Sequence, residues 1–429
     1  MVKKRTLSPL SIFDQLALPT FLQAHDYKEL HAVTIWRYMA QNPDASFGDV
    51  PGIPKTLGAL LCQHFVPFTT SIAMEKHSLD GTVKLLIKLQ DQHEIEAVIM
   101  RHTGRNTLCV SSQVGCQMAC TFCATGTLGI IADLGSGEIL EQLAHANRVA
   151  PIRNVVFMGM GEPLNNYDAV LAAIRAMTTV FGLAPKHITL STVGVIHRIR
   201  QLSHDAPLVR LALSLHAPTQ EMRSEIVPTS SAYPLKKLMA AIDDHLAMKE
   251  GRLVMVEYCM LAGVNDSIKT AHMLGNLLQN RSVHVNLIPY NTTEVGAQYE
   301  SPSPEDIRAF HAILREHYNL KATIRENHGT DIDGACGQLA LKNKSDSAVQ
   351  RDIEDFGRLG TRSLRKNTNA LLASGTKNDN VSSSFVASWL VRANDFIGEH
   401  QQAIGVALLG ASIVVIATGV VRRGRAHVI

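Results

Sequence analysis

The feature that most constrains this chain is a group of three cysteines within eight residues. Cys116, Cys120 and Cys123 follow the spacing Cys-x3-Cys-x2-Cys in the segment GCQMACTFCATG. Three thiolates on one short loop can hold three corners of a [4Fe–4S] cluster, which leaves one iron open to a substrate or cosubstrate. A structural zinc site would need a fourth ligand, usually from a second cysteine pair that the sequence lacks. Inert buried thiols would be unusual in a loop rich in Gly and Thr, so the spacing favours the cluster.

Cysteine usage elsewhere indicates a reducing compartment. The chain has 429 residues and seven cysteines, and an odd number with three clustered is no disulfide framework. The length allows one large domain and a smaller one. The formal net charge of +3 does not by itself indicate a nucleic-acid partner. The N-terminus has no apolar run of signal-peptide length, and a transit peptide is only weakly supported.

Residues 14–75 are expected to form a small helical module. Helical periodicity appears over 27–39 and again over 55–65. Cys62 lies among apolar residues of the second helix and is expected to be a core residue. In the first of these segments, Leu30, Val33, Trp36 and Arg37 stand at helical spacing.

Residues 76–106 look like a β-hairpin connector, with strands at 82–89 and 94–100. Alternation places Glu96 on the face opposite Ile95. A solvated carboxylate on a strand is the simplest interpretation of Glu96 from the residues alone.

From residue 107 to 342, short apolar strands alternate with helical segments, which predicts an α/β core with a mostly parallel sheet and right-handed crossovers. The first strand is expected to run from Thr107 to Gly115, and a last one to cover 321–326. Helices are expected at 136–149, capped by Ser136, and at 168–181. The expected starts of the other strands are Asn154, His187, Val209, Leu253 and Val283. Six such units favour a partial (β/α)6 barrel, open on one side, over a full eight-fold barrel.

The cysteine spacing resembles that of the radical S-adenosylmethionine (SAM) enzymes. In that superfamily the open iron chelates the amino and carboxylate groups of SAM, and reduction of the cluster releases a 5′-deoxyadenosyl radical. Polar residues suited to SAM gather at the predicted carboxyl ends of the strands, where such folds bind ligands. A Ser at a strand end is usually a turn former, and His216 is equally well explained as a satisfied loop histidine. The candidates are Gly161, Glu162, Ser191, Ser214, His216 and Asn291.

A second unusual cysteine lies near the end of this region. Cys336 is in the Gly-flanked, acidic segment DIDGACGQL, where a core residue is not expected. Such a cysteine would be a reactive thiol or an extra metal ligand.

Together these motifs resemble one family, the radical-SAM RNA adenine methyltransferases, which methylate an aromatic carbon of adenosine in rRNA and, in some members, tRNA. The resemblance covers about residues 14–342. It implies a 4Fe–4S cluster and SAM as cofactors, RNA as substrate, and an electron donor such as flavodoxin or ferredoxin. It adds Leu215 to the SAM-binding positions and makes the helical module an RNA-binding accessory domain. The segments that carry it are TLCVSSQVGCQMACTFCATG, NVVFMGMGEPLNNY, LALSLHAP, VNLIPYN and DIDGACGQL.

The resemblance also implies roles for residues outside the triad. Carbon 2 of adenine lies between two ring nitrogens and is too electron-poor to attack SAM, but a carbon radical can add to it. The family carries the methyl group on one cysteine, implied here to be Cys336, and releases the product by disulfide formation with a second, implied to be Cys109. Glu96 falls on the position of the proposed base. Cys259 matches no motif and is expected to be a core residue.

The segment after residue 342 has no counterpart in that family. Residues 343–402 are expected to be a polar linker that ends in an amphipathic helix. Residues 403–421 carry no charge and are long enough to span a bilayer as one helix. A buried core helix or an error of gene prediction would explain this run as well. A C-terminal membrane anchor is favoured, with the catalytic domain in a reducing compartment, cytoplasm or organelle; without insertion the chain would be a soluble cytoplasmic protein.

Three other functions stay open at this point. Related enzymes with the same motifs methylate carbon 8 of adenosine instead of carbon 2. A methylthiotransferase would need a second cluster, and only Cys62 and Cys109 lie upstream of the triad. An inactive, membrane-tethered iron–sulfur protein is disfavoured by the intact SAM motifs.

Overall fold

The computed structural model describes residues 5–293 and 298–339. The chain divides into two units, 1–342 and 343–429, and every described residue belongs to the first. Within the described residues, no helix has the length and apolar character needed to cross a membrane. The predicted linker at 343–402 and membrane helix at 403–421 lie outside the described residues and stay predictions.

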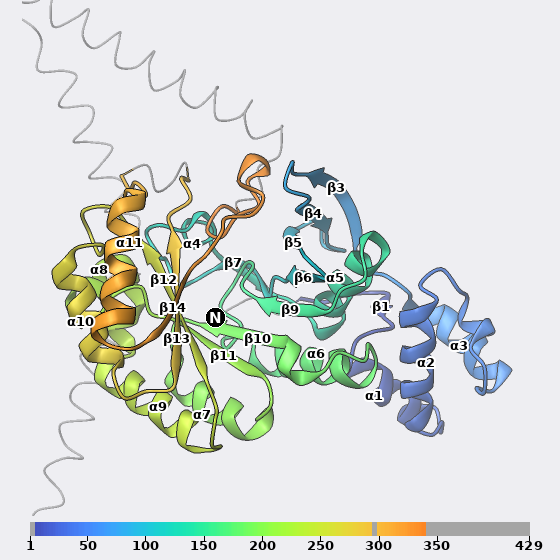
Figure 1. Cartoon of the computed structure of the whole chain (residues 1–429). Helices are drawn as coiled ribbons and strands as arrows, with labels where there is room; N and C mark the ends of the chain where they lie inside the picture. Colours follow the sequence, from blue (N-terminus) through green and yellow to red (C-terminus); the bar gives the residue numbers. More distant parts are fainter. Residues whose placement is uncertain (1–4, 294–297, 340–429) are drawn as a thin grey trace, which may run out of the picture. The chain divides into compact units, whose positions relative to one another are not determined.

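The centre of the described unit is a ten-stranded sheet in the order β14-β13-β12-β11-β10-β9-β6-β5-β4-β3 (Figure 1). Its parallel strands are β6 (Arg105–Cys109), β9 (Asn154–Phe157), β10 (Ile188–Thr192), β11 (Arg210–Ser214), β12 (Val254–Met260), β13 (Val283–Pro289) and β14 (Lys321–Ile324). They neighbour each other in chain order, so each crossover moves one strand along the sheet. This confirms the predicted alternation and the parallel sheet. The sheet does not close, because β14 and β3 are its two edges.

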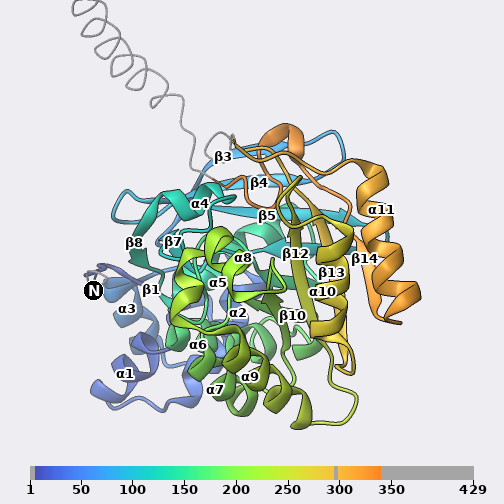
Figure 2. The same cartoon turned by 90° about the vertical axis from the view of Figure 1, so that its left-hand side faces the viewer.

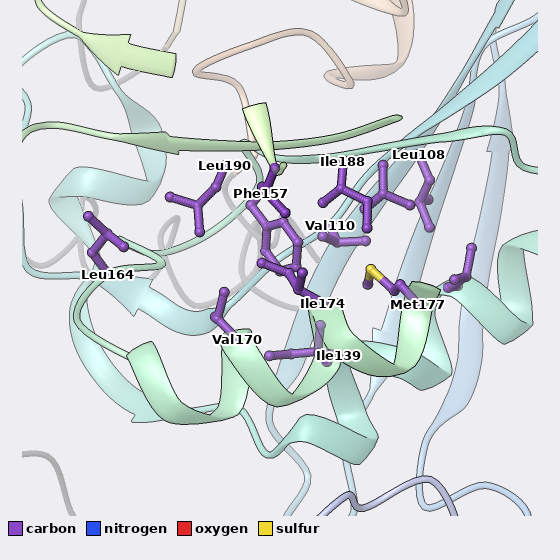
Figure 3. Packing of buried hydrophobic residues seen from close by; sticks show 14 of the residues in the cluster. Leu108, Val110, Ile139, Phe157, Leu164, Val170, Ile174, Met177, Ile188 and Leu190 are labelled. Atoms are coloured by element: carbon purple, nitrogen blue, oxygen red, sulfur yellow. The ribbon is translucent and has the colours of Figure 1, made fainter. Parts of the chain in front are cut away.

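Helices link the parallel strands and pack on the sheet. Figure 3 shows Val170, Ile174 and Met177 of α6 beside Phe157 and Ile188 of the sheet. The predicted helices appear as α5 (Ser136–Val149) and α6 (Tyr167–Thr179); the others are α7 (Ile196–Asp205), α8 (Gln220–Ile226), α9 (Leu235–Ala247), α10 (Ile268–Leu278) and α11 (Pro304–Ala312). The cap of α5 is Gly135 rather than Ser136: the backbone N–H of Gly135 donates to Glu138, while the Ser136 hydroxyl accepts from Gln15 N.

The predicted hairpin strands continue the central sheet. The antiparallel strands β3 (Ser71–His77), β4 (Val83–Lys88) and β5 (Glu94–His102) lie side by side at the top of Figure 2. Strand β5 pairs with β6, so the boundary expected between residues 106 and 107 runs through one sheet. Burial on both faces also makes the solvated interpretation of Glu96 wrong, since this side chain is only 2% exposed.

The strand expected from Thr107 to Gly115 is interrupted. Strand β6 ends at Cys109, and β7 (Gln113–Cys116) pairs with β8 (Gly129–Asp133) in a separate two-stranded sheet. Gly115 has φ +75°, and a Cβ there would lie 2.0 Å from the Gly129 oxygen. This conformation and close approach favour glycine and turn the chain away from β6. Cys109 and Cys116 therefore lie on different strands.

The N-terminal module contains the expected helices, but the prediction of Cys62 as a core residue was wrong. Leu30 is 61% exposed and Val33 is 39% exposed. The helix that contains them, α2, buries the face that carries Trp36 instead. The indole N–H of Trp36 donates to Ile12 O at 2.7 Å. Cys62 is exposed, since it follows buried Leu61 by one residue, about 100° further round the helix. The helices are α1 (Ala17–Ala24), α2 (Leu30–Gln41) and α3 (Lys55–His64), and the buried residues of α2 are Ala32, Ile35, Trp36 and Met39.

A buried carboxylate joins the last part of this module to the core. Both oxygens of Glu141 on α5 accept hydrogen bonds from Thr69 and Thr70, including the two backbone N–H groups at 2.8 to 3.0 Å. Burial raises the pKa of Glu141 to about 7 although these hydrogen bonds oppose the shift.

We expect Glu141→Gln to lower the free energy of unfolding by about 1–3 kcal/mol, because an amide N–H₂ would face donors and leave one of them unsatisfied. Urea denaturation measures this. Exposed Glu250 offers a matched control, and Glu250→Gln should stay within about 0.5 kcal/mol of wild type. Equal stabilities of the two variants would show that the Glu141 contacts contribute little.

Candidate active site

A cavity of about 160 Å³ lies at the carboxyl ends of the parallel strands. The three clustered cysteines line it together with Cys109 and Cys336. The fold thus gathers five thiols from positions between residues 109 and 336 into one space.

The triad lies in a largely apolar environment. Cys116 ends β7, and Cys123 precedes the short helix α4 (Ala124–Thr127). Burial raises the pKa of Cys116 to about 12. Burial also raises the pKa values of Cys120 and Cys123. Buried residues packed around the three thiols include Met118, Phe122, Val193, Ile226, Val227 and Tyr290.

Three thiols are the donors that a [4Fe–4S] cluster with one open iron requires. Among the described residues, no three His, Cys, Asp or Glu side chains converge as ligands of one metal ion. Ligands of different irons in one cluster need not meet at a point.

A buried cation near the triad also suits an anionic cluster. The guanidinium of Arg223 is fully buried and donates to the carbonyls of Leu215, Ser214 and Val193. In the part of the chain that the structure describes, its Nη1 has no partner. Burial lowers the pKa of Arg223 to about 10, and the neighbouring Cys120 opposes that shift. Three thiolates beside this group would compensate its charge.

Cys336 is close enough to Cys109 inside the cavity to affect the pKa of its thiol. Cys109 ends β6, and burial raises its pKa to about 12, with Cys336 as the next cause. Cys336 is solvent-accessible, but the cavity walls raise the pKa of its thiol while the Arg325 cation opposes the shift.

Hydrogen bonds to the triad segment hold the loop that carries Cys336. The backbone N–H of Ala124 donates to Gly337 O at 2.8 Å, and the Thr125 hydroxyl donates to Leu339 O at 2.6 Å. Asn291 Nδ2 donates to Cys336 O at 3.2 Å. Asn291, a predicted SAM-binding residue, therefore also positions this loop.

The β3–β4 hairpin holds the other side of the loop. Asp80 accepts from Gly329 N at 3.0 Å, and the Ser78 hydroxyl donates to Asp331 at 2.5 Å. Desolvation raises the pKa of Asp80, but hydrogen bonds from Thr82, Ser78 and Gly329 outweigh it and give a net lowering.

Glu96 lies close to this anchor but is not among the residues that line the cavity. Its Oε1 forms an ion pair with Lys84 Nζ at 2.9 Å, and its Oε2 has no partner among residues 5–293 and 298–339. The same ammonium group donates to Asp333 O at 3.1 Å, which links Glu96 to the Cys336 loop.

The Gly-Glu pair after β9 is tightly packed. Gly161 has φ +99°, and a Cβ there would lie 2.6 Å from Gln113 Cβ. The Glu162 carboxylate accepts from Leu164 N at 3.0 Å and Val193 N at 2.9 Å. Burial nevertheless raises its pKa to about 7. The Glu162 carboxylate therefore connects two loops at the cavity wall, and both of its oxygens already accept hydrogen bonds from the protein.

Three other predicted SAM-binding residues line the cavity and one does not. The hydroxyls of Ser191 and Ser214 are 3.0 Å apart. His216 Nδ1 accepts from Cys259 N at 3.0 Å, and burial, with Arg223 nearby, lowers the pKa of His216 to about 3. The neutral ring therefore carries its proton on Nε2. The Leu215 side chain belongs to the main hydrophobic core.

Sequence reasoning missed several cavity residues. Cys259 is buried, as expected, yet it also lines the cavity with Glu257 of the same strand and Arg325. Side chains two apart on a strand share a face, so the period of two along β12 was the available signal.

The comparisons with known proteins agree with this geometry. Residues 110–274 match the family model of the Radical SAM superfamily. A probable dual-specificity RNA methyltransferase RlmN of Geobacillus kaustophilus is 38% identical over 336 residues, which cover 77% of this chain and 91% of the relative. The dual-specificity RNA methyltransferase RlmN 1 of Myxococcus xanthus is 39% identical over 331 residues, which cover 75% of this chain and 91% of that relative. The solved structure of a radical SAM methyltransferase from Sphaerobacter thermophilus matches with a TM-score of 0.73 and 36% identity, covering 78% of this chain and all of that one.

We expect Gly115→Ala to abolish cluster binding, because a Cβ would collide with Gly129 O and displace Cys116 beside it. Gly104 is a matched control, since its φ is +76° but a Cβ there would meet nothing within 4 Å. Gly104→Ala should cost about 1–2 kcal/mol of stability and keep the iron. Iron and sulfide content after reconstitution are the measurements; full iron loading of Gly115→Ala would contradict the role of the close approach.

Proposed function

The chain belongs to the radical SAM RNA methyltransferase family of the enzymes named RlmN, and from this premise we propose that it methylates carbon 2 of an adenosine in ribosomal RNA and also in transfer RNA. It is a SAM-dependent radical RNA methyltransferase with a 4Fe–4S cluster. The observation that most supports methyl transfer through a cysteine carrier is that Cys109 and Cys336 line the same cavity as the triad.

The proposed ligands of the cluster are Cys116, Cys120 and Cys123. The predicted SAM-binding residues that line the cavity would bind SAM. Bound there, the cluster and SAM supply a 5′-deoxyadenosyl radical. An electron-transfer protein such as flavodoxin or ferredoxin would provide the electrons.

Cys336 would act as the methyl carrier. Its thiolate takes the methyl group of a first SAM in a displacement that leaves S-adenosylhomocysteine. The methyl group on the Cys336 sulfur would then lose one hydrogen atom to the radical that the cluster and a second SAM supply, and the resulting sulfur-bound carbon radical would add to carbon 2 of the base. The adduct then loses one electron to the electron-transfer partner and its carbon-2 proton to a base, which restores the aromatic ring.

Cys109 would release the product. Its thiolate attacks the Cys336 sulfur, a disulfide forms, and the electron pair of the broken sulfur–carbon bond stays on the methylene carbon. That carbon takes up a proton and becomes the methyl group of the RNA. Two electrons reduce the disulfide before the next turnover. Glu96 is the proposed proton acceptor, which requires its side chain to move from Lys84 toward the cavity.

We expect Cys336→Ala to bind its cluster and to lose methyl transfer by several orders of magnitude, since no other group carries the methyl. Cys62→Ser, at an exposed cysteine outside the cavity, should keep the wild-type rate. Mass spectrometry of RNA incubated with each protein measures the product and its position on the base. Methylation by Cys336→Ala at the wild-type rate would refute the carrier role.

On sequence alone, residues 403–421 are proposed to anchor the protein in a membrane. Deletion of residues 403–429 should move the protein from the membrane fraction to the supernatant without loss of RNA methylation. Cell fractionation measures this, and full-length protein in the supernatant would contradict the anchor.

A further inference from the structure

Glu257 on β12 is a buried carboxylate in the wall of the cavity. Its side chain is 3% exposed. Oε2 accepts a hydrogen bond from Asn286 Nδ2 at 2.8 Å, across the register of β12 and β13. Oε1 is buried and has no protein partner among the described residues.

Two other buried carboxylates, Glu162 and Glu141, use both of their oxygens, whereas Glu96, which also has one oxygen without a partner among the described residues, does not line the cavity. Each oxygen of Glu162 accepts from a backbone N–H, and so does each oxygen of Glu141. Native folds rarely leave a buried acceptor unsatisfied unless a ligand completes it. Because Glu257 lines the cavity, the missing donor would come from a molecule bound there.

The ionised form of Glu257 is the form that accepts hydrogen bonds at both oxygens. Burial raises the pKa of Glu257, and the Arg325 cation and the hydrogen bond from Asn286 oppose that rise. An ionised carboxylate has no proton to donate, so its partner must bring an N–H or O–H group.

Glu257 also lies where two cavities meet. A second cavity, of about 450 Å³, shares Glu257 and Arg325 with the first. Its walls are rich in cationic and histidine side chains, which suit the phosphates of a nucleic-acid backbone. They include Arg105, Lys186, His187 and Arg210.

We propose that Glu257 Oε1 accepts a hydrogen bond from the exocyclic amine of the target adenine and thereby selects adenine. This inference rests on the proposed function. The amine carries the N–H donors of the adenine ring, whereas guanine has a carbonyl oxygen at that position, which a carboxylate repels. Purine riboside lacks the amine and would leave Oε1 unsatisfied.

Asn286 fixes which group of residue 257 faces the base. Its Oδ1 accepts from the Thr323 hydroxyl at 3.4 Å, so its Nδ2 points to Glu257. In Glu257→Gln, the new amide oxygen would turn toward Asn286 Nδ2, and the new N–H₂ group would face the cavity. The acceptor for the amine becomes a donor. In the double variant Glu257→Gln/Asn286→Asp, the carboxylate next door would accept that N–H₂ group and return the amide oxygen to the cavity.

The test compares methyl transfer to two RNAs that carry adenosine or purine riboside at the methylated position. For wild type, Glu257→Gln and the double variant, kcat/KM is measured for each RNA. The adenosine-to-purine ratio is compared between proteins, so that the intrinsic reactivity of the two bases cancels. Cluster content and formation of 5′-deoxyadenosine check that each variant is folded and loaded.

Glu257→Gln should lower the adenosine-to-purine ratio by about 10- to 100-fold, the range of one hydrogen bond to a charged group. The double variant should regain most of that ratio. An unchanged ratio in Glu257→Gln, or equal losses on both RNAs, would overturn the proposal, because an acceptor for the amine cannot affect a base that lacks it. A failure of the proposed function looks different, since wild type would then methylate neither RNA.

Discussion

The structure depends on a pair of hydrogen bonds that dock the last described loop onto the triad segment. The backbone N–H of Ala124 and the hydroxyl of Thr125 donate to carbonyls of Gly337 and Leu339. Cys123 immediately precedes these donors, and Cys336 immediately precedes the first acceptor. The same contacts therefore fix the position of Cys336 relative to the triad and complete the wall of the cavity.

The hairpin strands supply the opposing support. Because β5 continues the sheet through β6, the turn between β3 and β4 is attached to the rigid part of the fold. From there Ser78, Asp80 and Lys84 reach the other side of the Cys336 loop. The hairpin, which the sequence predicts to be a connector, thus supports the loop that forms one wall of the cavity. Glu96 is buried beside Lys84 because it lies on a strand of this hairpin.

Local patterns predicted the features that local physics controls. The strand and helix alternation from β9 onward, the ends of α5 and the cysteine triad all follow from spacing and periodicity in the chain. The break between β6 and β7 could not be predicted, because it depends on the approach of Gly115 to Gly129. Arg223 and Glu257 were missed for a related reason. The role of a buried charged residue depends on the neighbours that the fold brings to it, and these neighbours are distant in the sequence.

The loop that closes the cavity is also the last described part of the chain to leave the ribosome. A nascent chain that ends before this loop already contains the triad, Cys109 and the strands beneath them. Its thiols would face solvent until residues 328–339 dock on Ala124 and Thr125. The order of synthesis thus gives the unfinished protein an interval before the loop of Cys336 covers the three cysteines that are proposed to hold the cluster.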